Sequence, residues 1–309
     1  MPNYGVGKES SVFGKTSNQH DYKDDRMVKT KITILCENRA GLTKNIIGEH
    51  GFSAFVEQEG EKILLDTGQG LGLTTNAKTL GIDLSKINTI VLSHGHYDHT
   101  GGLSQLLPFS KKTKIIAHPD VFGPKYSHHK DNVKKPFHYI GLPFSEDVLK
   151  ADPNCELILR KTFKKISDQI FFSGQVPRVT DFEINDKRLK LKQQKGFSED
   201  PLFDDTSLLI ETNKGPVILT GCAHSGIVNV MKHFEKMTGH RQFHAVIGGT
   251  HLGFLNSKDQ LEKTMDAFEA YGLDLIAVSH CTGNEASAEC YNRFREKFAF
   301  ANAGWSIEF

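Results

Sequence analysis

Residues 93–102, Ser-His-Gly-His-Tyr-Asp-His-Thr-Gly-Gly, concentrate ionisable side chains at one point of the chain. The potential metal ligands in this stretch are His94, His96, Asp98 and His99. Neutral imidazole nitrogen and carboxylate oxygen both bind zinc and similar divalent ions. The stretch follows residues 89–92, Thr-Ile-Val-Leu, an apolar run that predicts a buried strand. The pattern therefore indicates a metal site at a strand end rather than a polar surface loop.

Three more histidines follow predicted strands in the second half of the chain. They are His224, His251 and His280, and each lies within two residues of a glycine, cysteine or serine. One such histidine alone could be a hydrogen-bonded core residue. Three at successive strand ends indicate a shared site.

The elements that must position these side chains alternate along the sequence. Apolar runs predict strands at 32–35, 52–57, 62–66, 89–92, 114–117, 206–211, 216–219, 245–247 and 275–278. Helical patterns occur at 71–80, 103–107, 227–237 and 260–271. This alternation favours a layered α/β arrangement.

Residues 93–102 resemble the signature of the metallo-β-lactamase-fold superfamily of metallohydrolases. Residues 63–68, Ile-Leu-Leu-Asp-Thr-Gly, resemble the strand-end aspartate segment that precedes it there. One branch is labelled after an archaeal enzyme of methanopterin synthesis, which joins a dihydropterin to ribofuranosylaminobenzene phosphate. Segments similar to that branch are 172–178, 217–226, 246–252 and 277–283. The resemblance covers most of residues 31–309 and implies an α/β fold, a four-layer αββα sandwich of two mixed β-sheets flanked by helices.

The resemblance also implies two divalent metal ions, with zinc as first choice and iron or manganese as alternatives. The first ion would be held by His94, His96 and His224, and the second by Asp98, His99 and His280. Two such ions, roughly 3.5–4 Å apart, lower the pKa of a bridging water. The resulting hydroxide can attack a carbonyl or phosphoryl centre.

Cys222 departs from the pattern of the superfamily, which usually has a metal-bridging aspartate at this position. The superfamily also supplies an earlier histidine to the first ion, but no histidine lies between His138 and His224 here. Cys222 either provides a thiolate ligand or packs behind the ligands. We expect packing, with His224 as the firmer ligand assignment.

Four residues receive roles beyond simple metal binding. Asp98 is expected to orient the hydroxide as well as to bind metal. His251 resembles a histidine that assists proton transfer in ribonuclease Z-type relatives. The alternative role for His251 is that of a metal ligand. Asp66 is expected to accept a ring N–H from a ligand histidine, or else to cap a strand. Arg178 could pair with a phosphate or carboxylate of the substrate.

Composition limits the classes of partner. The 309 residues include 38 lysine and arginine and 37 aspartate and glutamate, for a formal net charge of +1. This balance disfavours nucleic acid and anionic membrane as partners.

The sequence shows no apolar run of the roughly 18 residues that a membrane span needs and no secretory signal at its start. The odd count of five cysteines favours reduced thiols. We expect a soluble cytoplasmic protein, whose oligomeric state stays open.

The expected domain organisation has three parts. Residues 1–26 are polar and form a mobile N-terminal extension, while 27–309 form a single domain. Residues at about 119–200 form an insertion over the active site, where substrate-selecting loops would lie. Its histidines, His128, His129 and His138, could contact substrate, but we favour solvated loop residues.

Two function hypotheses of different class follow. The first is a dinuclear metal-dependent hydrolase that uses a metal-bridging hydroxide on a small anionic substrate, phosphorylated or ester. The second is a transferase that joins a dihydropterin to a ribofuranosylaminobenzene phosphate-like partner. A non-catalytic metal-holding sensor is a third, disfavoured because every candidate ligand is present. The sequence contains no glycine-rich phosphate loop or dinucleotide fingerprint that would indicate another class of enzyme.

Overall fold

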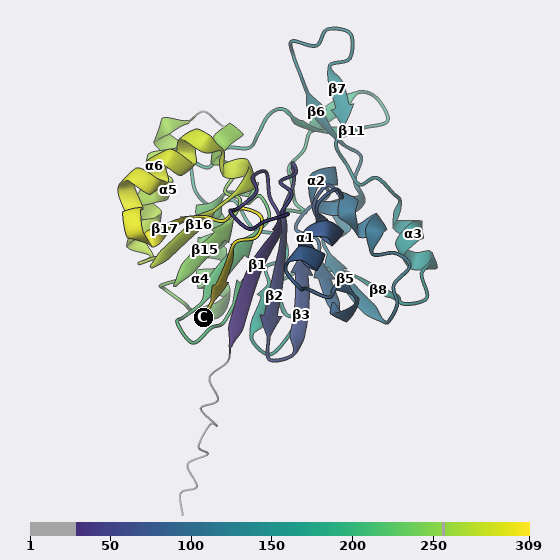
Figure 1. The fold of residues 1–309 in the computed structure, drawn as a ribbon. Helices are drawn as coiled ribbons and strands as arrows, with labels where there is room; N and C mark the ends of the chain where they lie inside the picture. Colours follow the sequence, from purple (N-terminus) through teal and green to yellow (C-terminus); the bar gives the residue numbers. More distant parts are fainter. Residues whose placement is uncertain (1–28, 255–256) are drawn as a thin grey trace, which may run out of the picture.

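In the computed structural model, which describes residues 29–254 and 257–309, two large β-sheets stack face to face with helices on the outside (Figure 1). The helices are α1 (Leu73–Thr79), α2 (Tyr97–Thr100), α3 (Glu146–Ala151), α4 (Ile227–Thr238), α5 (Lys258–Ala270) and α6 (Asn284–Phe294). The arrangement is the αββα sandwich that the sequence predicted. The expected N-terminal extension, residues 1–26, lies outside the described residues.

The first sheet has seven strands. Their spatial order is β18 (Ser306–Glu308), β1 (Thr30–Cys36), β2 (Ser53–Gln58), β3 (Glu61–Leu65), β4 (Thr89–Val91), β5 (Thr113–Ala117) and β8 (Cys155–Leu159). Strands β1, β2 and β3 pair antiparallel, and β2 and β3 form a hairpin around Glu59-Gly60. From β3 through β4 and β5 to β8 the pairing is parallel.

The second sheet repeats this mixture of pairings. Its order is β17 (Phe298–Phe300), β16 (Leu275–Val278), β15 (Ala245–Gly248), β14 (Val217–Thr220), β13 (Ser207–Ile210), β10 (Ile170–Phe172) and β9 (Lys164–Lys165). The strands from β14 to β17 pair parallel, whereas β14, β13 and β10 pair antiparallel. Both sheets are therefore mixed, as predicted.

Three apolar clusters hold the layers together. The central cluster lies between the sheets and joins residues such as Ile32 and Val91 of the first sheet to Leu219 and Ala277 of the second. A second cluster packs α4, α5 and α6 on the outer face of the second sheet, around Phe234. A third packs α1 on the outer face of the first sheet. Each sheet is thus buried on both faces, which explains why its central strands are almost wholly apolar.

The parallel strands bring the polar turns together. Carboxyl ends of parallel strands meet at one edge of a sheet, and the turns after β3, β4, β14, β15 and β16 all carry candidate site residues. Four non-glycine residues in these turns have left-handed backbone with φ between 50° and 58°, namely Asp66, Ala223, His251 and His280. This conformation is unfavourable for residues with a β-carbon and often marks a functional site.

A third, four-stranded sheet forms a lobe that projects beyond the sandwich near α2 (Figure 1). Its order is β12 (Phe197–Glu199), β11 (Leu189–Lys192), β6 (Lys125–His128) and β7 (Phe137–Tyr139). The expectation of one insertion over 119–200 was therefore wrong in extent, because β8 and β10 within that range belong to the two large sheets. Only 125–139 and 187–199 build the lobe, and they pair with each other through β6 and β11.

Several helices also differ from expectation. The helix expected at 103–107 is a 3-10 turn at Gly101–Gln105, and neither α3 nor α6 was predicted. Within the described part of the chain, the helices are too short or too polar to span a lipid bilayer.

The central cluster generates a stability prediction. Leu219→Ala should lower the free energy of unfolding by about 3 kcal/mol, because Leu219 is fully buried between the sheets and its loss leaves a cavity. Leu42→Ala is the matched control, since Leu42 is fully exposed, and it should change stability by less than about 0.5 kcal/mol. Urea denaturation measures both; equal effects would contradict the assignment of this core.

Candidate metal centre

Three histidines form a first cluster of nitrogen donors. His94 Nε2 lies 2.9 Å from His96 Nδ1 and 3.2 Å from His224 Nε2. His94 and His96 come from the turn after β4, and His224 comes from the turn after β14 in the other sheet. All three side chains are buried. The structure thus brings together the three residues that the sequence assigned to the first metal.

The second cluster lies directly beside the first. His99 Nε2 is 3.2 Å from His280 Nε2, and Asp98 Oδ2 is 3.8 Å from His99 Nε2 and 3.4 Å from His280 Nε2. His99 and Asp98 lie on α2, whereas His280 follows β16. The rings of His94 and His99 are only 4.2 Å apart between centroids. These are the three residues that the sequence assigned to the second metal.

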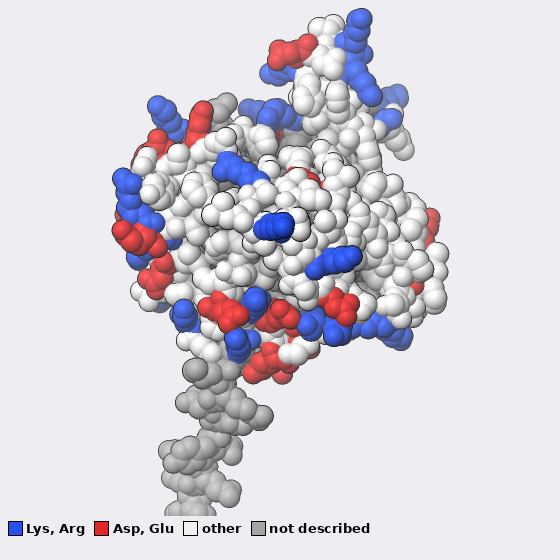
Figure 2. Space-filling view, viewed as in Figure 1, with Lys and Arg blue, Asp and Glu red and all other residues white. Residues whose placement is uncertain are grey.

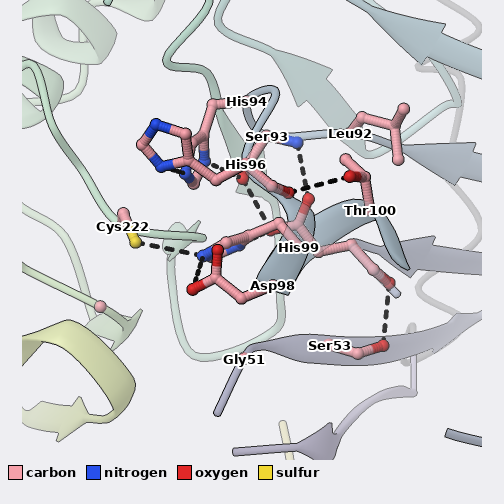
Figure 3. A network of polar contacts seen from close by, with 12 residues as sticks. Gly51, Ser53, Leu92, Ser93, His94, His96, Asp98, His99, Thr100 and Cys222 are labelled. Carbon is pink, nitrogen blue, oxygen red and sulfur yellow. Dashed lines mark hydrogen bonds and ion pairs between the residues drawn. The ribbon is translucent and has the colours of Figure 1, made fainter. Parts of the chain in front are cut away.

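Cys222 lies between the two clusters. Its Sγ atom is 3.2 Å from His99 Nε2, as Figure 3 shows. Its donor atom groups within 4.8 Å both with His94 and His99 and with His224 and His251. Burial raises the pKa of this thiol well above its ordinary value, so a proton must leave before the sulfur can bind metal as a thiolate. This position suits a ligand better than the packing role that we expected from the sequence.

The Asp66 carboxylate organises both clusters from behind. Asp66 Oδ2 lies 2.7 Å from His99 Nδ1, and it also accepts a 2.6 Å hydrogen bond from Ser93 Oγ. Ser93 Oγ in turn lies 2.9 Å from His94 Nδ1. Since the serine proton goes to Asp66, Ser93 Oγ accepts the Nδ1 proton of His94. Asp66 thereby directs the Nε2 atoms of His94 and His99 away from itself and toward the two clusters.

The donor atoms fit metal ions better than they fit each other. With Nδ1 of His94 protonated toward Ser93, its Nε2 atom presents a lone pair to the Nε2 of His224, 3.2 Å away. Burial lowers the pKa of His96 to about 3 and keeps these rings neutral. At this distance either His224 Nε2 donates its proton to the His94 lone pair, or a metal ion replaces that proton and binds both nitrogens. Ligands of a tetrahedral zinc ion lie about 3.4 Å apart, given zinc–nitrogen bonds of about 2.1 Å.

Two residues outside the clusters hold His280 in position. Its Nδ1 atom lies 2.8 Å from Asn38 Oδ1, and its backbone N–H donates to Glu37 Oε1 at 2.7 Å. Asn38 Oδ1 can only accept, so Nδ1 carries the proton and Nε2 faces His99 and Asp98. His280 therefore carries its proton on Nδ1, as His94 and His99 do.

The His251 ring is held by a carboxylate through its Nε2 atom. That atom lies 3.2 Å from Asp186 Oδ2. Burial opposes a charge on the ring, but Asp186 raises the pKa of His251 to about 9. The ring nevertheless lies 4.2 Å from the His224 ring between centroids. A charged ring held by a carboxylate fits a proton donor better than a metal ligand.

The clusters open on one side into a cavity of about 290 Å³. Its metal-facing wall contains Asp98, Cys222, His224 and His280. The lobe contributes further lining residues, namely Arg188, Leu189, Ser127, His128 and His129. We expected the loop histidines to be solvated, but His128 and His129 line this cavity. His138 does not line it.

Among the described residues, those that line this cavity do not include Arg178. Its guanidinium donates to the backbone carbonyl of His224 at 2.8 Å and to Asn185 Oδ1 at 3.2 Å. The expectation of a substrate contact is therefore corrected: Arg178 supports the His224 turn. The arginine that reaches the cavity is Arg188.

Sequence reasoning missed three residues of the site. His50 Nε2 lies 3.2 Å from Asp98 Oδ2 at the rim of the cavity, and Asp186 and Arg188 approach from the lobe side. His50 precedes a strand, so a search of the carboxyl ends of strands passed over it. Its position beside Gly51, directly before the apolar run that begins at Phe52, was the available signal.

Comparison with known proteins agrees with this geometry. The profile of the Metallo-beta-lactamase superfamily matches residues 46–280. The chain is 31% identical over 296 residues, 90% of this chain and 96% of the relative, to the 7,8-dihydropterin-6-methyl-4-(beta-D-ribofuranosyl)-aminobenzene-5'-phosphate synthase of Methanocaldococcus jannaschii. It is 34% identical over 264 residues to an uncharacterized protein of the same organism, covering 82% of this chain and 91% of that protein.

Solved structures show the same fold. A metal-dependent hydrolase of the beta-lactamase superfamily superposes with a TM-score of 0.75 at 27% identity, covering 91% of this chain and 99% of that one. A diphosphatase of the PhnP family superposes with a TM-score of 0.51 at 15% identity, covering 92% and 98% of the two chains. The chain therefore belongs to the metallo-β-lactamase superfamily, whose fold implies divalent metal binding.

Metal binding should depend on pH through His99. Burial opposes a charge on this ring, but Asp66 and Asp98 raise its pKa to about 9, so the metal-free protein holds a proton there at pH 7. A metal must displace that proton, and affinity should therefore rise by up to about tenfold per pH unit until pH 9. Zinc titration calorimetry at pH 7, in buffers of different ionisation enthalpy, should show proton release. Unchanged affinity between pH 6 and 9 would refute this linkage.

A second prediction concerns Cys222. If its thiolate binds metal, the cobalt-loaded protein should show a sulfur-to-cobalt charge-transfer band, and Cys222→Ser should abolish the band and weaken metal retention. Cys290→Ser is the matched control, because Cys290 is an equally buried thiol in the helix-packing cluster. A band that survives Cys222→Ser, or that never forms, would return Cys222 to a packing role.

Proposed function

We propose that the protein is a dinuclear metal-dependent hydrolase that acts on a small anionic substrate, a phosphoester or an ester. The observation that carries the proposal is the pair of neighbouring three-donor clusters, which both reach the same cavity, with the Cys222 sulfur between them. Each cluster joins a turn of the first sheet to a turn of the second. A structural metal site is usually closed on all sides, whereas this site opens toward a cavity.

The donor chemistry indicates where two ions would bind. His94, His96 and His224 would hold one ion, and Asp98, His99 and His280 would hold the other; Cys222 is placed to contact both. Two divalent ions there would supply an activated water near neutral pH and would polarise an oxygen of the substrate. Zinc is our first choice, since imidazole, carboxylate and thiolate together suit it.

Other side chains at the cavity would serve the reaction directly. Asp98 lines the cavity, and His99 and His280 hold its pKa well below the ordinary range, so it stays ionised and can orient a water by accepting its proton. His251 lines the same cavity and holds a proton through Asp186, which suits it to protonate a leaving oxygen. These are the two catalytic roles that the sequence suggested.

Arg188 favours an anionic substrate. Two of its nitrogens bind the Asp186 carboxylate, at 2.9 and 2.5 Å, and its guanidinium lies 5.0 Å from the centre of the Phe254 ring. This fixes a cation at the wall of the cavity that the metal clusters also line. A phosphate or carboxylate group would bind between them with favourable charge on both sides.

The second candidate function is the transferase. It is favoured by the 31% identity, over nearly the full length of both chains, to a protein named as a synthase of a dihydropterin–ribofuranosylaminobenzene phosphate compound. The two reactions need the same metals but different second substrates. Supplying a dihydropterin together with the ribofuranosylaminobenzene phosphate, and following the joined product by mass spectrometry, separates them: product formation would favour the transferase.

The test of the hydrolase is Asp98→Asn. The fold should survive, because the amide nearly keeps the volume, while hydrolysis of bis(4-nitrophenyl) phosphate should fall by about a hundredfold or more. Asp168→Asn, at a carboxylate whose side chain is 96% exposed, should leave the rate unchanged. Elemental analysis of the same samples should give close to two divalent ions per unaltered chain. Full activity in Asp98→Asn, or folded protein that takes up no zinc, iron or manganese, would refute the proposal.

A further inference from the structure

We propose that the lobe formed by β6, β7, β11 and β12 carries a second anion-binding subsite, which holds a phosphate group of the substrate at a distance from the reacting bond. The inference rests on the proposed function, because a distal subsite matters only when the metal centre holds the reacting group. It adds a substrate class: molecules with an anionic group at each end.

The metal-facing cavity continues into a larger groove on the lobe. The groove has a volume of about 870 Å³ and is formed by the connection between β6 and β7 together with Arg188. His128, His129 and Arg188 line both the cavity and the groove. The groove therefore adjoins the cavity at these three residues, where the far end of a substrate bound at the metals would lie.

The lobe is basic although the chain as a whole is nearly neutral. Segments 125–139 and 187–199 contain nine lysine and arginine residues but only two acidic ones, Asp131 and Glu199, whereas the whole chain has a formal net charge of +1. Figure 2 shows basic side chains along the projecting lobe. Such a concentration of one charge beside a cavity raises the local concentration of anions.

The basic groups that face the groove are free to bind a ligand. Lys130 and Lys134 line it and form no ion pair with any residue in the described part of the chain. Arg188 uses Nε and Nη2 on Asp186, which leaves its Nη1 nitrogen available. By contrast, Lys125 in the same lobe is buried and neutralised by Asp200 and Asp204, at 2.9 and 2.8 Å. Free cations are thus confined to the exposed side of the lobe.

The groove is held in shape before any ligand arrives. The backbone N–H of His129 donates to Pro136 O at 2.7 Å, and Asn132 Oδ1 accepts from the Lys135 N–H at 3.1 Å. Below the loop, the Phe137 ring stacks on His128 and on Phe197, with centroids 4.7 and 3.8 Å away. These contacts order the backbone that carries the lysines, so binding a ligand there does not also have to order the loop.

The chemistry of the groove favours phosphate as its ligand. The groove offers two lysine ammonium groups and an arginine Nη1, and several cationic donors suit the several oxygens of a phosphate group. One acidic side chain, Asp131, also lies in the groove, but the lysines and Arg188 outnumber it. The metals would take one anionic group of the substrate and the groove would take the other.

The test measures binding, so that it does not depend on turnover. The probes are butyl phosphate and a series of α,ω-alkanediol bisphosphates of increasing length, titrated into the zinc-loaded protein by calorimetry. The best bisphosphate should bind about tenfold more tightly than butyl phosphate, because its second phosphate gains charge-assisted hydrogen bonds. Lys130→Glu combined with Lys134→Glu should remove this advantage and leave the affinity for butyl phosphate within about twofold.

Lys192→Glu combined with Lys195→Glu is the matched control. It makes the same charge change on the same lobe, at residues that do not line the groove, and the bisphosphate advantage should remain. Equal affinity for butyl phosphate and every bisphosphate, or an equal loss in both double variants, would overturn the subsite. Failure to load zinc would instead refute the proposed function, while the comparison of the two double variants would still decide whether the groove binds phosphate.

Discussion

The contacts of one buried carboxylate, Asp66, determine the geometry of the whole site. Asp66 accepts hydrogen bonds from the backbone and side chain of Ser93, at 2.7 and 2.6 Å, and faces His99 Nδ1. Through Ser93 it also sets the tautomer of His94. A single negative charge with no exposure to solvent thus aims one donor of each cluster. Its own position depends on a left-handed backbone after β3, where a strand would otherwise continue.

The two clusters differ in charge although they are neighbours. Burial and neighbouring rings lower the pKa values of His94 and His224, so the first cluster is neutral. The second contains the ionised Asp98, and His50 at the rim shares that carboxylate. A neutral trio of nitrogens and a set with an anionic oxygen differ in hardness as ligands, so the two positions need not prefer the same metal. Cys222 lies between the clusters, and its thiolate would add a negatively charged donor beside the neutral first cluster.

The sequence predicted those parts of the site that follow regular strands. His94, His99, His224 and His280 each come after an apolar run, and parallel pairing brings such turns to one edge. His50, Asp186 and Arg188 come from irregular segments, where neither periodicity nor spacing marks a residue. The extent of the insertion was misjudged for a related reason: β10 has only three residues, and β8 is only partly buried, so neither was predicted as a strand of a large sheet. The pairing of 125–139 with 187–199 is a long-range contact that local patterns do not encode.

The division of each cluster between two sheets bears on how the site is assembled. His94 and His224 meet across 130 residues of chain, and His99 and His280 across 181. Closing loops of such length costs conformational entropy that must be offset by many other contacts. Small zinc domains fold around their metal, because their ligands are close in sequence. Here the apolar contacts between the sheets supply that offsetting stability, so the fold itself brings the ligands of each cluster together.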